Sequence, residues 1–513
     1  MRAAATAVVW LLAALAGAGC TGGRDTPSDV ITIAVTSSPN NLDPRVGTDE
    51  VSQKTQQLVF STLLALNDRL EVVGGLASGW TSPTPTIYLV TLRQGVLFHD
   101  GHELTADHVV YTFTSLLDPQ FVSPRKGAYR MLDRVEVVDR YTVRFTLKEP
   151  FGSFPVNLVI PIVPSGAGAG LRSTPIGTGP YKFVSFAVDD RVVLAPFSGY
   201  FGGAPVNGGV VVKVVPDDTM RGLELRKGAV DLVVNDLAPD IVHQLRGDPA
   251  LQVVEAPGSD YAYVGINLRD RVLADVRVRR ALSHAVDRDA IVTHLRRGLA
   301  SPAVGILPPM SWAFAPEVAT FAYDPQAAMR LLDEAGYRDP DGSGPAPRLH
   351  LTLKVSSTEF NRLQSSVLQQ DFARVGVELD VRTYEFATLY ADVLKGNFQL
   401  FTLQWVGVSD PDMLRRVFHT KQMPPTGFNR GFFSDSHVDA LIDEATSSTD
   451  AARRRELYTE AQRAIAEAVP YLSLWYKTNV AVARRDLTGL HLSPSADFLF
   501  LRGVTRGASA PAP

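Results

Sequence analysis

The sequence contains a single cysteine, Cys20, among its 513 residues, so no disulfide can form within the chain. Zinc sites built on four cysteines, or on two cysteines and two histidines, are excluded for the same reason. Charge of one sign is also lacking, because 50 Lys and Arg residues stand against 54 Asp and Glu residues. Nucleic-acid-binding proteins usually carry a strongly basic surface, so this balance argues against nucleic acid as a partner.

The common catalytic motifs are missing as well. The chain has no HExxH, no G-x-S-x-G and no P-loop. Scattered Ser, His and Asp residues leave a hydrolase open as an alternative, but the sequence favours a protein that is not an enzyme and needs no cofactor. The densest group of metal-ligand side chains consists of His99, Asp100, His102, Glu103, Asp107 and His108. We interpret it as a hairpin turn leading into a helix capped by Thr105, with a metal site as the alternative.

The one long uncharged apolar stretch covers residues 3–18, after Arg2 and directly before Cys20. A short positive start, an apolar segment and small residues predict an export signal over residues 1–19. Cys20 then resembles the acylated cysteine of a bacterial lipoprotein, although Gly17 stands where such signals usually carry leucine. Ordinary secretion and an uncleaved anchor are the alternatives. The sequence therefore predicts an exported protein, lipid-anchored at Cys20 through a tether over residues 20–29 and facing the periplasm or the cell exterior.

Local patterns beyond the tether predict a mixed α/β protein. Apolar residues predict a strand at 30–35, a helix over 51–66 and a strand over 88–98. Alternating strands at 349–355 and 377–381 enclose a helical pattern, which predicts a parallel pair with a right-handed crossover. A last long helix should begin after Asp450.

Five segments stand in order along the chain: Leu42-Asp43-Pro44, residues 92–113 beginning LRQGVLFHDG, residues 175–181 (PIGTGPY), residues 278–288 (VRRALSHAVDR) and residues 323–337 beginning YDP. Together they resemble the dipeptide- and oligopeptide-binding proteins of bacterial ABC importers, the extracellular solute-binding family 5. Their spacing matches the family from about residue 30 to residue 501. The function that this implies is capture of a small ligand, most often a peptide, and delivery to ABC permease subunits in the membrane.

The resemblance also implies an architecture. It is an α/β fold of the periplasmic-binding-protein-like type II (cluster C), with two main lobes, a ligand cleft and an extra inserted domain. The boundaries expected are 30–60, 173–266 and 481–506 for domain I, 61–172 for domain II, 267–480 for domain III, and 507–513 for a disordered tail. The ligand is expected between domains I and III, and the protein is expected to be a monomer.

Candidate ligand contacts lie where apolar runs end in polar loops. They are Trp405, Asp410 and Asp412 after the run 398–403, Tyr263 and Asn267 at the entry to domain III, Ser37 and Ser38 after the first strand, and Asn429. Peptide-binding relatives usually carry aspartate three residues after the loop tryptophan, but here that residue is Val408. Two alternatives follow: Asp410 takes the amine if a peptide binds, or no residue fills that role. A sugar, an opine or a metal chelate remains an alternative ligand, and a sensor or chaperone role an alternative function.

Overall fold

The computed structural model describes residue 27 and residues 29–342 and 344–507. The predicted signal peptide, Cys20 and most of the tether lie outside the described residues, as does the predicted tail after Gly507. Of the helices in the described residues, none combines the length and the apolar character needed to cross a bilayer.

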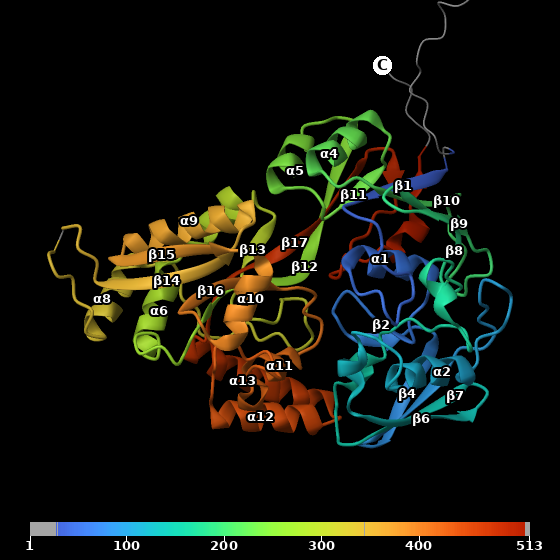
Figure 1. Ribbon diagram of the computed structural model, residues 1–513, viewed down its shortest axis with the longest axis horizontal. Coiled ribbons are helices and arrows are strands. Elements are labelled where there is room, and N and C mark those ends of the chain that lie inside the picture. The colour runs from blue at the N-terminus through green and yellow to red at the C-terminus, as the bar shows by residue number, and fades with distance from the viewer. Residues whose placement is uncertain (1–26, 28, 343, 508–513) are drawn as a thin grey trace, which may run out of the picture.

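One mixed sheet of eleven strands runs through two lobes in the order β15-β14-β16-β12-β17-β11-β1-β10-β9-β8, with β13 (Ala300–Pro302) paired to β17. Its two longest strands are β12 (Leu251–Ile266) and β17 (Tyr471–Arg484), which pair antiparallel and cross from one lobe to the other (Figure 1). Their register shifts between Pro257 and Tyr261, at the crossing. We call the lobe formed by domain I lobe I and the lobe formed by domain III lobe III. The sheet passes from lobe I to lobe III at this bulge.

Lobe I is built on the predicted first strand, β1 (Val30–Val35), whose residues after Val30 are all buried. A strand covered on both faces reads as a continuous apolar run, and β1 pairs parallel to both of its neighbours. The other strands of the lobe are β8 (Tyr181–Ala187), β9 (Arg191–Pro196), β10 (Gly209–Val214) and β11 (Leu232–Val234). Its helices are α1 (Glu50–Val59), α4 (Asp218–Lys227) and α5 (Pro239–Leu245). Asp49 caps α1 by accepting a hydrogen bond from the Ser52 N–H.

The predicted helix over 51–66 is correct only to Val59. Beyond it the chain pairs with a distant segment, since Leu63 N–H donates to the Ile160 carbonyl and Leu64 N–H to the Leu158 carbonyl. Leu64–Leu66 is strand β2, so tertiary pairing overrides the helical pattern. The strand predicted over 88–98 also ends early, at Leu92, because Gly95 takes a left-handed conformation with φ of 72°.

A small antiparallel sheet forms the core of the inserted domain II. Its strands, in sheet order, are β4 (Ala77–Thr84), β5 (Ile87–Leu92), β7 (Thr142–Leu147) and β6 (Leu132–Asp139), and α2 (Ala106–Leu117) packs on it. The short elements of this region are β3 (Val72–Gly74), η1 (Lys126–Tyr129), α3 (Phe154–Asn157) and η2 (Ala169–Arg172). The turn and helix cap predicted for the histidine-rich segment are confirmed, because Thr105 precedes α2 and its N–H donates to Nδ1 of His108 at 3.1 Å.

Lobe III contains the predicted βαβ unit. Strands β14 (Leu349–Ser356) and β15 (Val377–Tyr384) are parallel and are joined by α9 (Glu359–Ala373). After α10 (Phe386–Lys395), strand β16 (Leu400–Trp405) adds parallel to β14. The remaining helices are α6 (Val276–Ala285), α7 (Arg288–Ala290), η3 (Ile291–Leu295), α8 (Pro325–Glu334), α11 (Met413–Phe418), η4 (Thr420–Gln422), α12 (Ser436–Ser447) and the predicted last long helix, α13 (Ala451–Ala468). After β17 come β18 (Leu487–Thr488), η5 (Leu499–Gly503) and β19 (Thr505–Arg506).

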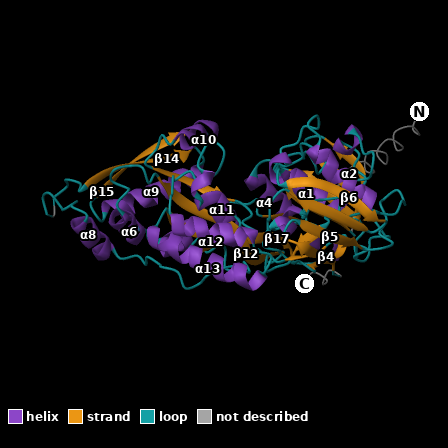
Figure 2. Ribbon diagram, turned by 90° about the horizontal axis from the view of Figure 1, so that it is seen from below, coloured by secondary structure: helices purple, strands orange, loops and turns teal. Residues whose placement is uncertain are grey.

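The buried apolar residues fall into separate clusters. One is drawn from residues 63–162, and two others, on opposite faces of the lobe III sheet, are drawn from residues 261–476. Seen from below, lobe III stands on one side, lobe I and domain II on the other, with β12 and β17 between them (Figure 2). We retain the domain boundaries given above as a proposal.

Candidate ligand-binding cleft

Parallel strands from both lobes end beside the crossing. In lobe I, β11 runs parallel to β1 and ends at Val234, which pairs with Ala481 of β17. In lobe III, β16 ends at Trp405, which pairs with Tyr261 of β12, directly after the bulge. Ligands of open α/β sheets bind outside the carboxyl ends of parallel strands. The chain therefore brings two such ends, one from each lobe, to the same crossing.

The bulge itself is tied to segments from both lobes. The N–H of Ser259 donates to the carbonyl of Pro494, which belongs to lobe I, at 3.2 Å. On the other side, the Ser259 carbonyl accepts from the N–H of Val408 at 3.0 Å, and Oδ1 of Asp260 accepts from the N–H of Gly407 at 2.9 Å. The loop that follows Trp405 is thus fixed to the residues about which the lobes would turn.

A cavity of about 180 Å³ lies against this crossing and is lined from both lobes. Its residues are Asn235, Leu237, Pro239 and Val242 from lobe I, Arg296, Leu299, Gln404 and Trp475 from lobe III, and Lys477, Thr478 and Val480 from the crossing part of β17. We call it the hinge cavity. It is a place where a bound group would touch both lobes at once.

Arg296 and Lys477 are the charged residues that line the hinge cavity. The Arg296 guanidinium lies 4.4 Å from the ring centroid of Trp475, and its Nε is buried with no hydrogen-bond partner in the part of the chain that the structure describes. Burial lowers the pKa of Arg296 to about 10. Burial also lowers the pKa of Lys477, and Asp260, whose Oδ2 is 3.9 Å from Nζ, only partly opposes this. Both cations are therefore incompletely neutralised.

Trp405 is half-buried and lies in an aromatic group on lobe III. Its ring is nearly parallel to that of Tyr263, and the guanidinium of Arg430 lies 4.7 Å from its centroid. Phe428, which is 41% exposed, meets it edge-on. The indole Nε1 is buried without a hydrogen-bond partner among the described residues. Such an arrangement offers a ligand an apolar face with a cation behind it.

Asp410 lies away from the hinge cavity, in a cavity of about 430 Å³ between lobe III and domain II. Trp312, Arg454 and Ser153 share that cavity with it. Burial raises the pKa of Asp410, and the negative charge of Asp412 raises it further. Asp412 itself is paired with Arg415 through two hydrogen bonds of 2.7 Å. The positive charge of Arg454 and a hydrogen bond from the Asp412 N–H oppose the rise in the pKa of Asp410 only in part, so a further cation would stabilise the Asp410 carboxylate.

Three other predicted contacts are used for packing in this structure. Tyr263 is fully buried and stacks on Tyr471 with ring centroids 4.1 Å apart. The amide of Asn267 donates to the carbonyl of Phe398 at 2.8 Å. The amide of Asn429 donates to the carbonyl of Phe433 at 2.7 Å. Contact of these residues with a ligand stays a prediction.

Of the two serines that follow β1, Ser37 is exposed and the hydroxyl of Ser38 accepts a hydrogen bond from the N–H of Asp189 at 2.6 Å. Both stand at the carboxyl end of β1. Sequence reasoning did not select Arg296 or Lys477. The available signal for Lys477 was a single charge inside the otherwise uncharged run 471–483.

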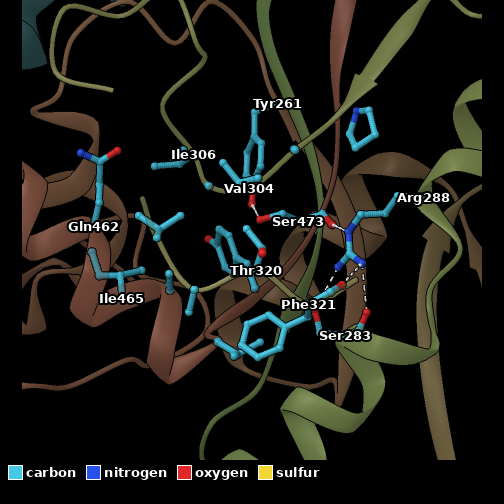
Figure 3. Close-up of a pocket in the computed structure, with 18 of the residues that line it drawn as sticks. Tyr261, Ser283, Arg288, Val304, Ile306, Thr320, Phe321, Gln462, Ile465 and Ser473 are labelled. Atoms are coloured by element: carbon cyan, nitrogen blue, oxygen red, sulfur yellow. Dashed lines mark hydrogen bonds between the residues drawn. The ribbon is translucent and has the colours of Figure 1, made fainter. Parts of the chain in front are cut away.

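A third cavity, of about 260 Å³, lies inside lobe III (Figure 3). There the Tyr261 hydroxyl and the Ser473 hydroxyl are 2.7 Å apart, and the Arg288 guanidinium donates to the carbonyls of Ser473 and Phe321 and to the hydroxyl of Ser283. Apart from residues of β12, its lining belongs to residues 283–473. Because Tyr261 of β12 is the one lining residue that falls within the domain I boundaries, the cavity is not shared between the lobes, and we place the ligand in the hinge cavity rather than here.

Comparison with known proteins identifies the family. The model of the bacterial extracellular solute-binding proteins, family 5 (middle region), matches residues 71–423. The chain belongs to this family. The glutathione-binding protein GsiB of Salmonella typhimurium is 30% identical over 488 residues, covering 92% of this chain and 93% of the relative. Heme-binding protein A of Haemophilus influenzae is 27% identical, with 92% of each chain covered.

Among solved structures, the oligopeptide-binding protein AppA of Bacillus subtilis, in complex with a nonapeptide, superposes with a TM-score of 0.74 at 26% identity. The match covers 94% of this chain and all of AppA. The predicted type II periplasmic-binding-protein fold is confirmed by this likeness. As a family 5 member, the chain is an exported solute-binding protein of the kind that serves ABC importers, and its relatives are binding proteins rather than enzymes.

Proposed function

We propose that the protein captures a small ligand, most often a peptide, between lobes I and III and delivers it to the permease subunits of an ABC importer. The observation that carries this proposal is the hinge cavity, which both lobes line at the crossing of β12 and β17. A ligand that touches both lobes binds the closed arrangement better than the open one, and so shifts the population towards it. The closed monomer would then dock on the permease.

A peptide is favoured because two relatives that match nearly the whole chain are named for glutathione and for oligopeptides. An extended peptide can add to an exposed backbone edge through main-chain hydrogen bonds, which tolerate many side chains. The relative named for heme supports a second candidate, a metal chelate or another flat solute, which would stack on Trp405 and Phe428. The sugar and opine ligands and the sensor or chaperone role have no comparable support.

A thermal-shift screen tests the proposal. A ligand that binds only the folded state stabilises it by about 2.7 kcal/mol at a hundredfold excess over Kd. Trialanine, reduced glutathione and hemin should be tested at millimolar and lower concentrations against the purified mature protein. We expect at least one peptide to raise the melting temperature in a saturable way. If hemin alone does so, the peptide proposal is replaced by the second candidate, and if no solute does, the protein is not a capture protein for these ligand classes.

A further inference from the structure

We propose that the hinge cavity is an anion subsite, in which Lys477 and Arg296 together hold a carboxylate of the ligand. The inference rests on the proposed function and adds to it the chemical class of the ligand, an organic acid such as a peptide with a free carboxyl end.

The first step in the argument is the supply of hydrogen-bond donors. Lys477 Nζ makes no hydrogen bond within the described residues, and of the Arg296 guanidinium only Nη2 donates, at 3.3 Å to the Leu299 carbonyl. The amides that line the cavity are partly used, because Asn235 donates to Asn479 and accepts from the Val480 N–H, and Gln404 donates to Asp260. The two cations therefore supply the charged donors that remain free to bond to a carboxylate.

The second step is the nearby negative charge. Asp260 already accepts from the Gly407 N–H and from the Gln404 amide, each at 2.9 Å. Glu50 is paired with Lys54 at 2.6 Å. Burial raises the pKa of Asp236, the remaining neighbouring carboxyl group, which weakens it as a counter-ion. None of the three carboxylates lines the cavity, so a ligand anion would face the cations rather than a carboxylate.

The third step is the size of the hinge cavity and its position at the crossing. Sites for whole small molecules commonly have volumes of about 300–1,000 Å³, so a cavity of about 180 Å³ fits one end of a ligand. Gln404 lines it, and Trp405 follows at the end of β16. The anionic end would lie at the crossing and the rest of the ligand along the Trp405 loop. Because Arg296 belongs to lobe III and the cavity wall around Asn235 to lobe I, the anion would also help to join the lobes.

Calorimetry and thermal shift on the mature chain test this inference, with trialanine, trialanine amide, reduced glutathione and inorganic phosphate as probes. We expect amidation to weaken trialanine about tenfold or more, the loss of a charge-assisted hydrogen bond. Lys477→Met should remove this preference by weakening trialanine and leaving the amide unchanged, and Arg296→Met should do the same. Lys227→Met is the matched control, since Lys227 is exposed at the end of α4, and it should behave as the parent protein.

Circular dichroism shows whether each variant folds. If Arg296→Met does not fold, the Lys477→Met variant still tests the anion subsite. Equal binding of trialanine and its amide, with no effect of Lys477→Met, overturns the anion subsite while the proposed function stands. If no peptide binds the parent protein, the proposed function fails, and phosphate decides the subsite. Stabilisation by phosphate that Lys477→Met abolishes supports an anion site, and the absence of any phosphate effect overturns it.

Discussion

At the scale of single residues, the buried carboxylate of Asp410 is the first group whose role can be tested. Asp410 is the residue that the sequence selected for a ligand amine, and the structure places it between lobe III and domain II, near Arg454. Its raised pKa reflects burial first and the charge of Asp412 second. A carboxylate in such surroundings gains from a cationic partner, and a peptide amine is one.

If a peptide amine binds there, Asp410→Asn should weaken trialanine by about a hundredfold, because breaking a buried charge pair costs about 3–5 kcal/mol. N-acetyl-trialanine should bind the variant and the parent protein equally. Isothermal calorimetry on the two peptides measures both effects. Small and equal losses would instead show that Asp410 serves the contact between lobe III and domain II and takes no part in peptide binding.

His99 supports a prediction about acid stability. Its Nε2–H donates to the Gly179 carbonyl at 3.0 Å while Nδ1 accepts from the Gly177 N–H at 3.3 Å, so the ring is held neutral. Burial lowers its pKa from 6.5 to about 4. Above pH 6.5 the ring is neutral in both the folded and the unfolded chain, and its contribution to stability is fully present. As the pH falls towards 4, the His99 ring binds a proton in the unfolded chain but stays neutral in the folded chain, so the folded state loses stability.

The expected loss from His99 over this range is of the order of 2–3 kcal/mol. Urea titrations of the parent protein and of His99→Gln between pH 7.5 and 4.5 would measure it. The variant should be less stable at pH 7.5 but should lose less stability on acidification. Parallel curves for the two proteins would mean that other groups govern the acid response.

At the scale of elements, a loop of domain II docks directly on lobe III. The N–H of Gly152 donates to the carbonyl of Thr446, at the end of α12, at 2.6 Å. A Cβ at Gly152 would lie 1.9 Å from the carbonyl oxygen of Ser448. The side chain of Arg454, in α13, completes the contact by donating to the hydroxyl of Ser153. The two units can meet in this way only with glycine at position 152.

Gly152→Ala should therefore separate domain II from lobe III. We expect ligand affinity to fall about tenfold and the radius of gyration to rise, since each 1.4 kcal/mol of lost closed-state stability is a factor of ten. Gly127→Ala is the matched control in the same domain, because a Cβ there meets nothing within 4 Å. Calorimetry and small-angle scattering compare the two variants. Identical behaviour would show that this contact does not contribute to ligand capture.

The elements also show what the sequence can predict. The prediction of the βαβ unit of β14, α9 and β15 is confirmed. Its alternating and helical patterns are local, and Gly376 follows the end of the helix. The helix over 51–66 fails beyond Val59 because the next residues pair with a distant segment. Arg279 lies off the apolar stripe of its helix and is nevertheless buried, since its guanidinium donates to the carbonyls of Leu273 and Ala468. Local periodicity carries no information on such partners.

At the scale of the whole molecule, the candidate site depends on segments far apart in the chain. Trp405 was found because an apolar run ends there in a polar loop. Arg296 and Lys477 were missed because they lie in segments far apart in the sequence, and only the crossing of β12 and β17 brings them to one cavity. The resemblance to a family predicted the lobes, whereas the charges at their junction were found from the packing of the structure.

The position of the molecule relative to the membrane gives the last prediction. Cys20 lies outside the described residues, and the chain enters lobe I at Val30, the start of β1. A fully extended chain spans at most about 3.6 Å per residue, so the ten-residue tether over 20–29 would hold the lobe within about 36 Å of the bilayer. That distance keeps the closed protein within reach of a permease in the same membrane. Two acyl chains or more are needed for stable anchoring, which a diacylglyceryl thioether at Cys20 would provide.

Mass spectrometry of the protein extracted from membranes should therefore show residues 1–19 missing and a diacylglyceryl group on Cys20. Cys20→Ser removes the thiol that carries the lipid, and this variant should move from the membrane fraction to the soluble exported fraction while keeping its ligand affinity. Retention of affinity is expected because the binding lobes begin beyond the tether. An intact Met1 on the membrane-bound protein would instead identify the apolar segment 3–18 as an uncleaved anchor.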